Sequence, residues 1–219
     1  KEAAFAAINN NFSHYSPVPG FLDLRQAVCE KLKRDNGIDY VPAQICVSNG
    51  AKQSIMNVLA SIINDGDEVI LPAPYWVSYD EMVKMMGGKS VFIETTIEND
   101  FKMTAEQLEN AITPKTKALL YSSPCNPSGS FYTYSELEKM ANVIAKYPQI
   151  TIISDEIYEK INYEGKHVSI AEFPQVCEQT AVINGMSKAF AMTGWRIGYS
   201  ACPDWLAKAV EKIQGQVTS

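Results

Sequence analysis

The run Ile150-Thr151-Ile152-Ile153 is apolar and β-branched along its length and leads directly into Ser154-Asp155-Glu156-Ile157-Tyr158. Strands that are covered by helices on both faces read as such continuous apolar runs. Residues 150–153 are therefore predicted to form a central strand of a sheet. Asp155 stands just beyond that strand, where a polar side chain can face a ligand.

Strands and helices alternate on either side of this run, with short turns between them. Short apolar runs predict further strands at residues 45–47, 68–71, 90–94, 118–121, 181–183 and 197–199. Apolar spacing predicts helices at residues 21–34, 51–63, 77–86, 135–146 and 204–214, and capping boxes are predicted at Thr104/Gln107 and Ser135/Glu138. This alternation predicts an α/β fold with three layers (αβα): a mostly parallel sheet of about seven strands with helices on both faces, in one domain.

The composition is that of an ordinary globular domain, with 46% hydrophobic and 20% charged residues over 219 positions. A net charge of -6 argues against binding to nucleic acid or to an anionic membrane, and no apolar run approaches the roughly 20 residues that span a bilayer. There are two histidines and five scattered cysteines without a CxxC pair, so neither a metal site nor a disulfide framework is expected. We expect a reducing, cytoplasmic location.

The ends of the sequence suggest a fragment. The chain starts at Lys1 within an alanine-rich segment that is typical of the end of a helix, and it stops just after a helical pattern. No charged and apolar leader precedes the fold, so a secretory signal is not expected. We interpret residues 1–219 as one domain of a longer protein.

Five predicted strands are each followed by residues that can carry chemistry: Ser48-Asn49-Gly50-Ala51-Lys52, Pro74-Tyr75-Trp76, Pro124-Cys125-Asn126-Pro127, Asp155-Glu156-Ile157-Tyr158 and Gly185-Met186-Ser187-Lys188. Open α/β sheets bind ligands beyond the carboxyl ends of their strands. We therefore expect these segments to face one crevice.

Lys188 lies among the small and apolar residues Met186, Ala189 and Phe190. Loss of water around a lysine favours the neutral amine, a nucleophile that can form a Schiff base. The alternative is a lysine whose stem packs on apolar surface while its amino group reaches water. Asp155 also has two interpretations: it pairs with a protonated ring nitrogen, as a pyridine cofactor needs, or it caps a turn.

The remaining strand ends are individually weak signals. Gly50-Ala51-Lys52 can offer backbone amides at a helix N-terminus to a phosphate, although glycine is common in such turns. Trp76 can stack on a flat ring, but a lone tryptophan is more often part of a core. Asn126 belongs to a turn first and is a candidate ligand second.

The run Gly185-Met-Ser-Lys188-Ala-Phe-Ala-Met-Thr-Gly194-Trp-Arg196-Ile-Gly198 closely resembles the lysine-attachment motif of class I aminotransferases, the fold-type-I enzymes that use pyridoxal 5'-phosphate. The other turns follow in the order of that family, from His14-Tyr15 to Arg196. The resemblance thus covers almost the whole chain and implies the large, cofactor-binding domain of such an enzyme.

The resemblance also implies a role for each candidate residue. Lys188 would form the Schiff base and move the proton of the substrate Cα, Asp155 would pair with the ring nitrogen, and Trp76 would stack on the ring. Tyr158 and Asn126 would bind the phenolic oxygen. The phosphate would be held by a set of neighbouring groups: the backbone of Gly50, Ala51 and Lys52, the Ser187 hydroxyl and the Arg196 guanidinium, which matches phosphate geometry.

Tyr15 resembles a tyrosine that reaches the phosphate of the neighbouring subunit, which implies a homodimer with shared active sites. The implied reaction is a ping-pong transfer of an amino group from an amino acid to a 2-oxo acid. The motifs are most similar to bacterial aspartate aminotransferases, which implies aspartate as a substrate. The family's C-terminal small domain and an N-terminal segment have no counterpart in this sequence, so the isolated chain is expected to bind cofactor without turnover.

Three other interpretations use many of the same residues. A lyase of the same fold would share the cofactor site and differ in its substrate contacts. A cofactor-binding sensor domain of a transcription regulator would carry a basic DNA-binding module, which this sequence does not contain. An α/β domain without a cofactor would leave the joint pattern of Asp155, Tyr158, Lys188 and Arg196 unexplained.

Overall fold

The computed structural model describes residues 1–218, and Ser219, the last residue of the predicted domain, lies outside the described residues. Its centre is a seven-stranded sheet with the order β1-β7-β6-β5-β4-β2-β3. The strands are β1 Ile45–Asn49, β2 Glu68–Ala73, β3 Lys89–Glu94, β4 Thr116–Ser122, β5 Thr151–Asp155, β6 Thr180–Gly185 and β7 Ile197–Ala201. β7 runs antiparallel to both of its neighbours, and the other pairs are parallel.

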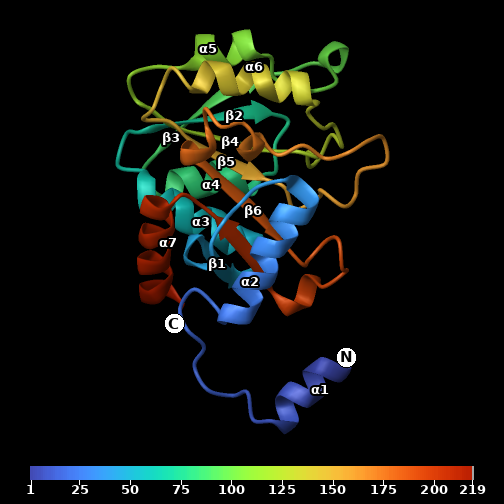
Figure 1. The fold of residues 1–219 in the computed structure, drawn as a ribbon. Coiled ribbons are helices and arrows are strands. Elements are labelled where there is room, and N and C mark those ends of the chain that lie inside the picture. Colours follow the sequence, from blue (N-terminus) through green and yellow to red (C-terminus); the bar gives the residue numbers. More distant parts are fainter. Residues whose placement is uncertain (219) are drawn as a thin grey trace.

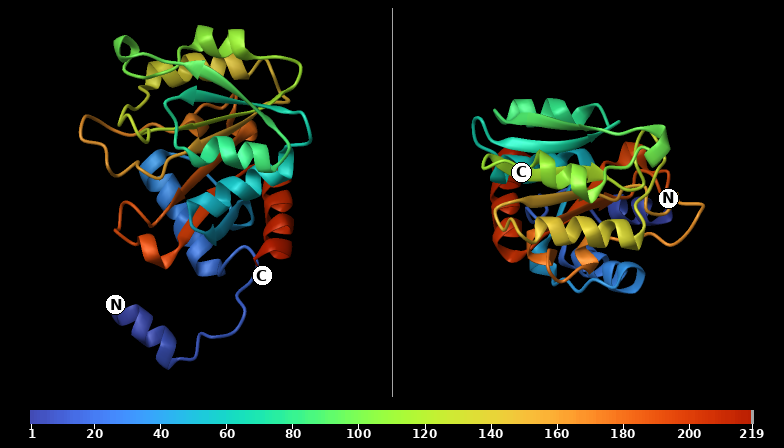
Figure 2. Two further views of the ribbon diagram at one scale, coloured as in Figure 1. Left: turned by 180° about the vertical axis from the view of Figure 1, so that it is seen from behind. Right: turned by 90° about the horizontal axis from the view of Figure 1, so that it is seen from above.

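Helices cover both faces of the sheet. They are α1 Glu2–Asn9, α2 Leu22–Lys31, α3 Ala51–Ile62, α4 Ser78–Met85, α5 Ala105–Ala111, α6 Tyr134–Ile144 and α7 Asp204–Val217. α2 covers the face of the sheet that is turned to the viewer in Figure 1. α3 and α4 cover the other face, which is turned to the viewer in the left panel of Figure 2. The predicted three-layer α/β fold with a mostly parallel sheet is confirmed.

The core is divided by the alternation of side chains along the strands. On β4, Ala118 and Leu120 pack with α3, α4 and α7, whereas Leu119 and Tyr121 pack with α5 and α6. β5 follows the same rule: Ile153 faces α3 and α4, and Ile152 faces α6. The side chain of Asp155, two residues after Ile153, is thus directed to the α4 face.

The predicted elements agree with the observed ones to within a few residues at their ends. One capping prediction was wrong. α6 begins after Thr133, whose hydroxyl accepts from the Glu136 amide while the Glu136 side chain accepts from the Thr133 amide. Ser135 lies inside the helix. A second candidate pair two residues away along the chain had the same spacing, and spacing alone could not separate the two.

The N-terminal segment lies apart from the sheet. α1 is joined to α2 by an extended segment and lies beyond one end of the fold (Figures 1 and 2). Large apolar side chains of this N-terminal segment are exposed: Phe5 and Ile8 on α1, and Phe12 after it. Over the described part of the chain, the helices are too short or too polar to cross a membrane.

Candidate active site

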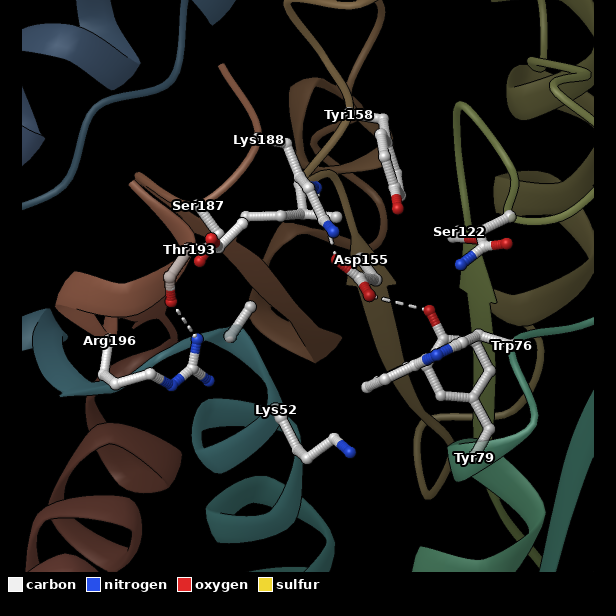
Figure 3. Close-up of a pocket in the computed structure, with 13 residues that line it drawn as sticks. Lys52, Trp76, Tyr79, Ser122, Asp155, Tyr158, Ser187, Lys188, Thr193 and Arg196 are labelled. Atoms are coloured by element: carbon white, nitrogen blue, oxygen red, sulfur yellow. Dashed lines mark hydrogen bonds between the residues drawn. The ribbon is translucent and has the colours of Figure 1, made fainter. Parts of the chain in front are cut away.

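A pocket opens at the carboxyl ends of the central strands, with a cavity of ≈ 180 Å³. All five predicted strand ends contribute to it. Its lining comprises Ala51, Lys52, Trp76, Tyr79, Ser122, Asn126, Asp155, Ile157, Tyr158, Ser187, Lys188, Thr193 and Arg196. Figure 3 shows these side chains converging on a common space from several elements. The sequence prediction of one shared crevice is therefore matched by the arrangement of the residues.

Asp155 forms the floor of the pocket and is 4% exposed. Its Oδ2 accepts a hydrogen bond of 2.7 Å from the Tyr79 hydroxyl, and its Oδ1 accepts one of 3.2 Å from the Ile157 amide. Neither partner carries a positive charge. Burial raises the pKa of Asp155 to about 6, although the two hydrogen bonds and the charge of Lys188 lower it.

Lys188 follows β6 and its amino group points toward Asp155 (Figure 3). Its Nζ lies 5.6 Å from the centre of the Tyr158 ring. Of the two interpretations of Lys188, the structure agrees with the one in which the amino group reaches solvent, because Lys188 is exposed. Met186, Ala189 and Phe190 instead line a separate cavity beside α2. Neighbours in a turn can point to opposite sides, so their composition does not fix the surroundings of one side chain.

A helix N-terminus lies at the other end of the pocket. Gly50 precedes α3 with φ 86° and ψ 160° and offers no side chain to cap the helix. The first amides of a helix have no partner within it, so Ala51 and Lys52 present free N–H groups at the pocket. An anion is favoured at such a position.

Two glycines let this helix end lie close to its neighbours. A Cβ at Gly198 would lie 2.2 Å from the Ala51 nitrogen, so any side chain on β7 there would push α3 away. A Cβ at Gly50 would lie 2.2 Å from a guanidinium nitrogen of Arg196. Arg196 itself donates to the Thr193 carbonyl at 2.9 Å and to the Asn49 carbonyl at 3.4 Å. The guanidinium thus sits beside the free amides of α3.

Trp76 forms one wall of the pocket. The Trp76 ring meets the Tyr79 ring edge-on, with 5.5 Å between the ring centres. The Lys52 Nζ lies 4.8 Å from the centre of the Trp76 ring. Lys52, Lys188 and Arg196 are exposed at the pocket, whereas its carboxylate, Asp155, is buried. The opening is therefore positive and suits an anionic ligand.

The structure places most of the predicted site residues together, with two exceptions. Gly50 lies behind the lining, against Arg196. Tyr15 is 95% exposed on the segment between α1 and α2 and does not line the pocket. The sequence reasoning missed Tyr79, which donates to Asp155, and Ser122, whose buried hydroxyl has no partner among the described residues.

The family model described as "Aminotransferase class I and II" matches residues 1–219. The chain belongs to this aminotransferase family. It is 48% identical to a "Probable aspartate/prephenate aminotransferase" of Rhizobium leguminosarum bv. phaseoli over all of this chain and 55% of the relative. The chain spans about half the length of the curated relatives it matches.

Solved structures of this family superpose closely on the chain. The aspartate aminotransferase of Rhizobium meliloti is 41% identical with a TM-score of 0.98, covering 100% of this chain and 55% of that one. An aromatic aminotransferase of Pyrococcus horikoshii OT3 is 40% identical with a TM-score of 0.95, over 99% of this chain and 58% of that one. The aminotransferase fold is thus shared by proteins that are named for different amino acids.

Proposed function

We propose that the protein containing this chain is a pyridoxal-phosphate-dependent aminotransferase that moves an amino group between an amino acid, aspartate first, and a 2-oxo acid. The observation that carries this proposal is Asp155. A fully buried carboxylate whose hydrogen-bond partners are both uncharged is unfavourable unless a cation joins it. A protonated ring nitrogen would supply that cation inside a pocket that also offers the amine of Lys188.

The residues present fit this cofactor from end to end. The amides of Ala51 and Lys52, the Ser187 hydroxyl and the Arg196 guanidinium would hold its phosphate. Gly50 leaves the space that Arg196 occupies, which a Cβ would fill. At the ring end, Trp76 would stack, Asp155 would pair with the nitrogen, and Tyr158 and Asn126 would bind the phenolic oxygen. The buried hydroxyl of Ser122, which has no hydrogen-bond partner among the described residues, supports a polar contact to a ligand at the ring end.

When bound, the cofactor supplies an electron sink for the bond that breaks at the substrate Cα. Lys188 would accept the Cα proton and return it at the end of the transfer, because its amino group lies over the floor of the pocket. Asp155 would keep a negative charge against the ring nitrogen, and Tyr79 would hold that carboxylate in place. Burial raises the pKa of Tyr79 well above its usual value, so its hydroxyl stays a donor.

Further parts of the proposal concern the whole protein. We infer that residues 1–219 are the large domain, and that the remaining length of the relatives includes a small domain that helps to bind substrate. The positive opening supports acidic substrates in a ping-pong exchange, and the name of the Rhizobium leguminosarum relative supports aspartate. The exposed Tyr15 is compatible with a homodimer in which it reaches the neighbouring site. Five unpaired cysteines support a reducing, cytoplasmic location.

The test uses the full-length protein with added pyridoxal 5'-phosphate, borohydride reduction and peptide mass mapping. We expect a visible absorption band and a reduced adduct on Lys188. Lys188→Ala should abolish the adduct, whereas the matched control Lys52→Ala, a second lysine at the same pocket, should retain it. An adduct on Lys52 or a labelled Lys188→Ala variant would contradict the assignment. Measuring amino transfer against release of ammonia and pyruvate then separates an aminotransferase from a lyase.

A further inference from the structure

A second group of buried charged side chains lies on the opposite face of the sheet from the pocket. Ser154 alternates with Asp155 along β5, so its side chain lies on the face away from α4. Glu156 follows on that side and is 1% exposed. A carboxylate this deeply buried must be hydrogen-bonded or paired to be tolerated.

The Glu156 carboxylate is fully surrounded by donors. Its Oε1 accepts from the hydroxyls of Ser169 at 2.6 Å and Ser154 at 3.0 Å, and its Oε2 lies 2.9 Å from His167 Nε2. The Glu156 amide also donates to the Ile183 carbonyl at 2.8 Å. One residue therefore ties the loop that carries His167 and Ser169 to the end of β5 and to β6.

The next turn is fixed in the same way. Glu159, 9% exposed, accepts from the Lys31 ammonium at 2.6 Å and from the Asn36 amide at 3.3 Å. Its own amide donates to the Glu156 carbonyl at 2.9 Å. Tyr158 stands between these two held carboxylates and Asp155 directly precedes the first, and both residues line the pocket.

The charged groups of this cluster act on His167 and on Asp155. Burial lowers the pKa of His167, but the charge and hydrogen bond of Glu156 outweigh it, and the net pKa is raised. Glu159 also raises it and Lys31 lowers it. On the pocket side, burial is the main cause of the raised pKa of Asp155, and the charge of Glu156 adds to it. An unpaired Glu156 would thus disfavour the charge that Asp155 needs.

We propose that Glu156, held by His167 and Ser169, is a positioning residue that sets the orientation of the Asp155–Tyr158 segment toward the cofactor. The inference rests on the proposed function. It differs from a metal site, for which Glu156, Glu159 and His167 offer ligand atoms within 4.8 Å of one another. Lys31 already pairs with Glu159, and Ser154, His167 and Ser169 already contact Glu156. A metal ion would have to displace these hydrogen bonds.

The experiment compares Glu156→Gln with the full-length wild type and with Glu172→Gln. Glu172 accepts from the Ser169 amide at 3.1 Å, so this control alters the same loop without touching the Glu156 carboxylate. The readouts are the dissociation constant of pyridoxal 5'-phosphate, the induced circular dichroism of its visible band, which reports its orientation, and the thermal midpoint. We expect Glu156→Gln to weaken binding about tenfold, in line with other groups that orient a ligand's direct contacts, and to reduce the dichroic band. Glu172→Gln should match the wild type in both.

Each other outcome has a defined meaning. A Glu156→Gln variant with wild-type affinity and dichroism, and only a lower thermal midpoint, would overturn the inference. Stoichiometric uptake of Zn²⁺ by the wild type that Glu156→Gln abolishes would also overturn it, because the cluster would then be a metal site. If the single variant does not fold, E156Q/H167Q replaces both side chains of this contact and is read by the same criteria. A wild type that takes up no cofactor on Lys188 refutes the proposed function itself, and this inference with it.

Discussion

The raised pKa of Asp155 makes a prediction about the stability of the protein without cofactor. Its carboxyl changes from an ordinary value of 3.8 to about 6 on folding. The folded state then binds the proton more tightly than the unfolded state. Asp155 therefore stabilises the fold most below pH 4, and that contribution is lost as pH rises toward 6. A change of about two pKa units corresponds to about 3 kcal/mol between the two limits.

Asp155→Asn removes this dependence because the amide is neutral at every pH. The amide keeps one acceptor for Tyr79 or Ile157 and loses the other, which costs about 1 kcal/mol. We expect the variant to be less stable than the wild type by about 1 kcal/mol at pH 4. At pH 7 it should be more stable by about 2 kcal/mol, since the 3 kcal/mol penalty of the buried charge is gone.

The assay is urea unfolding followed by tryptophan fluorescence from pH 4 to 8, without added cofactor. Asp39→Asn serves as the control, because Asp39 is an exposed partner of Lys33 and its loss should shift the curve by less than about 1 kcal/mol. A stability difference between Asp155→Asn and wild type that stays constant across this range would refute the reasoning. Added cofactor should then stabilise the wild type more than the variant, because the ring nitrogen pairs only with the carboxylate.

Two further predictions concern local structure. Thr133→Ala should lower the free energy of unfolding by about 1 kcal/mol through loss of the α6 cap, whereas Ser135→Ala should change it by less than about 0.5 kcal/mol, as urea unfolding will show. Gly50→Ala should weaken cofactor binding because the new methyl group meets Arg196 at 2.2 Å. Gly66→Ala is its control. Gly66 has a similar φ of 83°, but no described residue lies within 4 Å of the new methyl group, so this variant should lose stability without losing cofactor affinity in a binding titration.

The fold could be predicted from the sequence because it follows from patterns that a window of residues contains. The run Ile150-Thr151-Ile152-Ile153 reads as a doubly covered strand, and the structure buries it on both faces. The start of α6 was misplaced because Thr133/Glu136 and Ser135/Glu138 have the same spacing. Only the backbone conformation at Thr133 decides between the two pairs.

The site was predictable where strand ends deliver a residue to a known edge of the sheet, as for Asp155 and Lys188. It was not predictable where a contact joins distant elements. Tyr79 reaches Asp155 from α4, 76 positions away along the chain. Gly198 matters only because α3 lies against β7 there, and no local pattern marks that approach.

The alternation of side chains along β5 links the two halves of the candidate site. Asp155 and Glu156 are adjacent carboxylates that would repel one another on the same face. The strand end sends them to opposite faces, where Tyr79 meets one and His167 meets the other. Glu156 finds its hydrogen-bond partners within the protein, in His167, Ser154 and Ser169. Both hydrogen-bond partners of Asp155 among the described residues are uncharged, so a cationic ring that entered the pocket would relieve its negative charge. Of these two adjacent carboxylates, Glu156 is satisfied within the fold, and Asp155 is the one that faces the pocket.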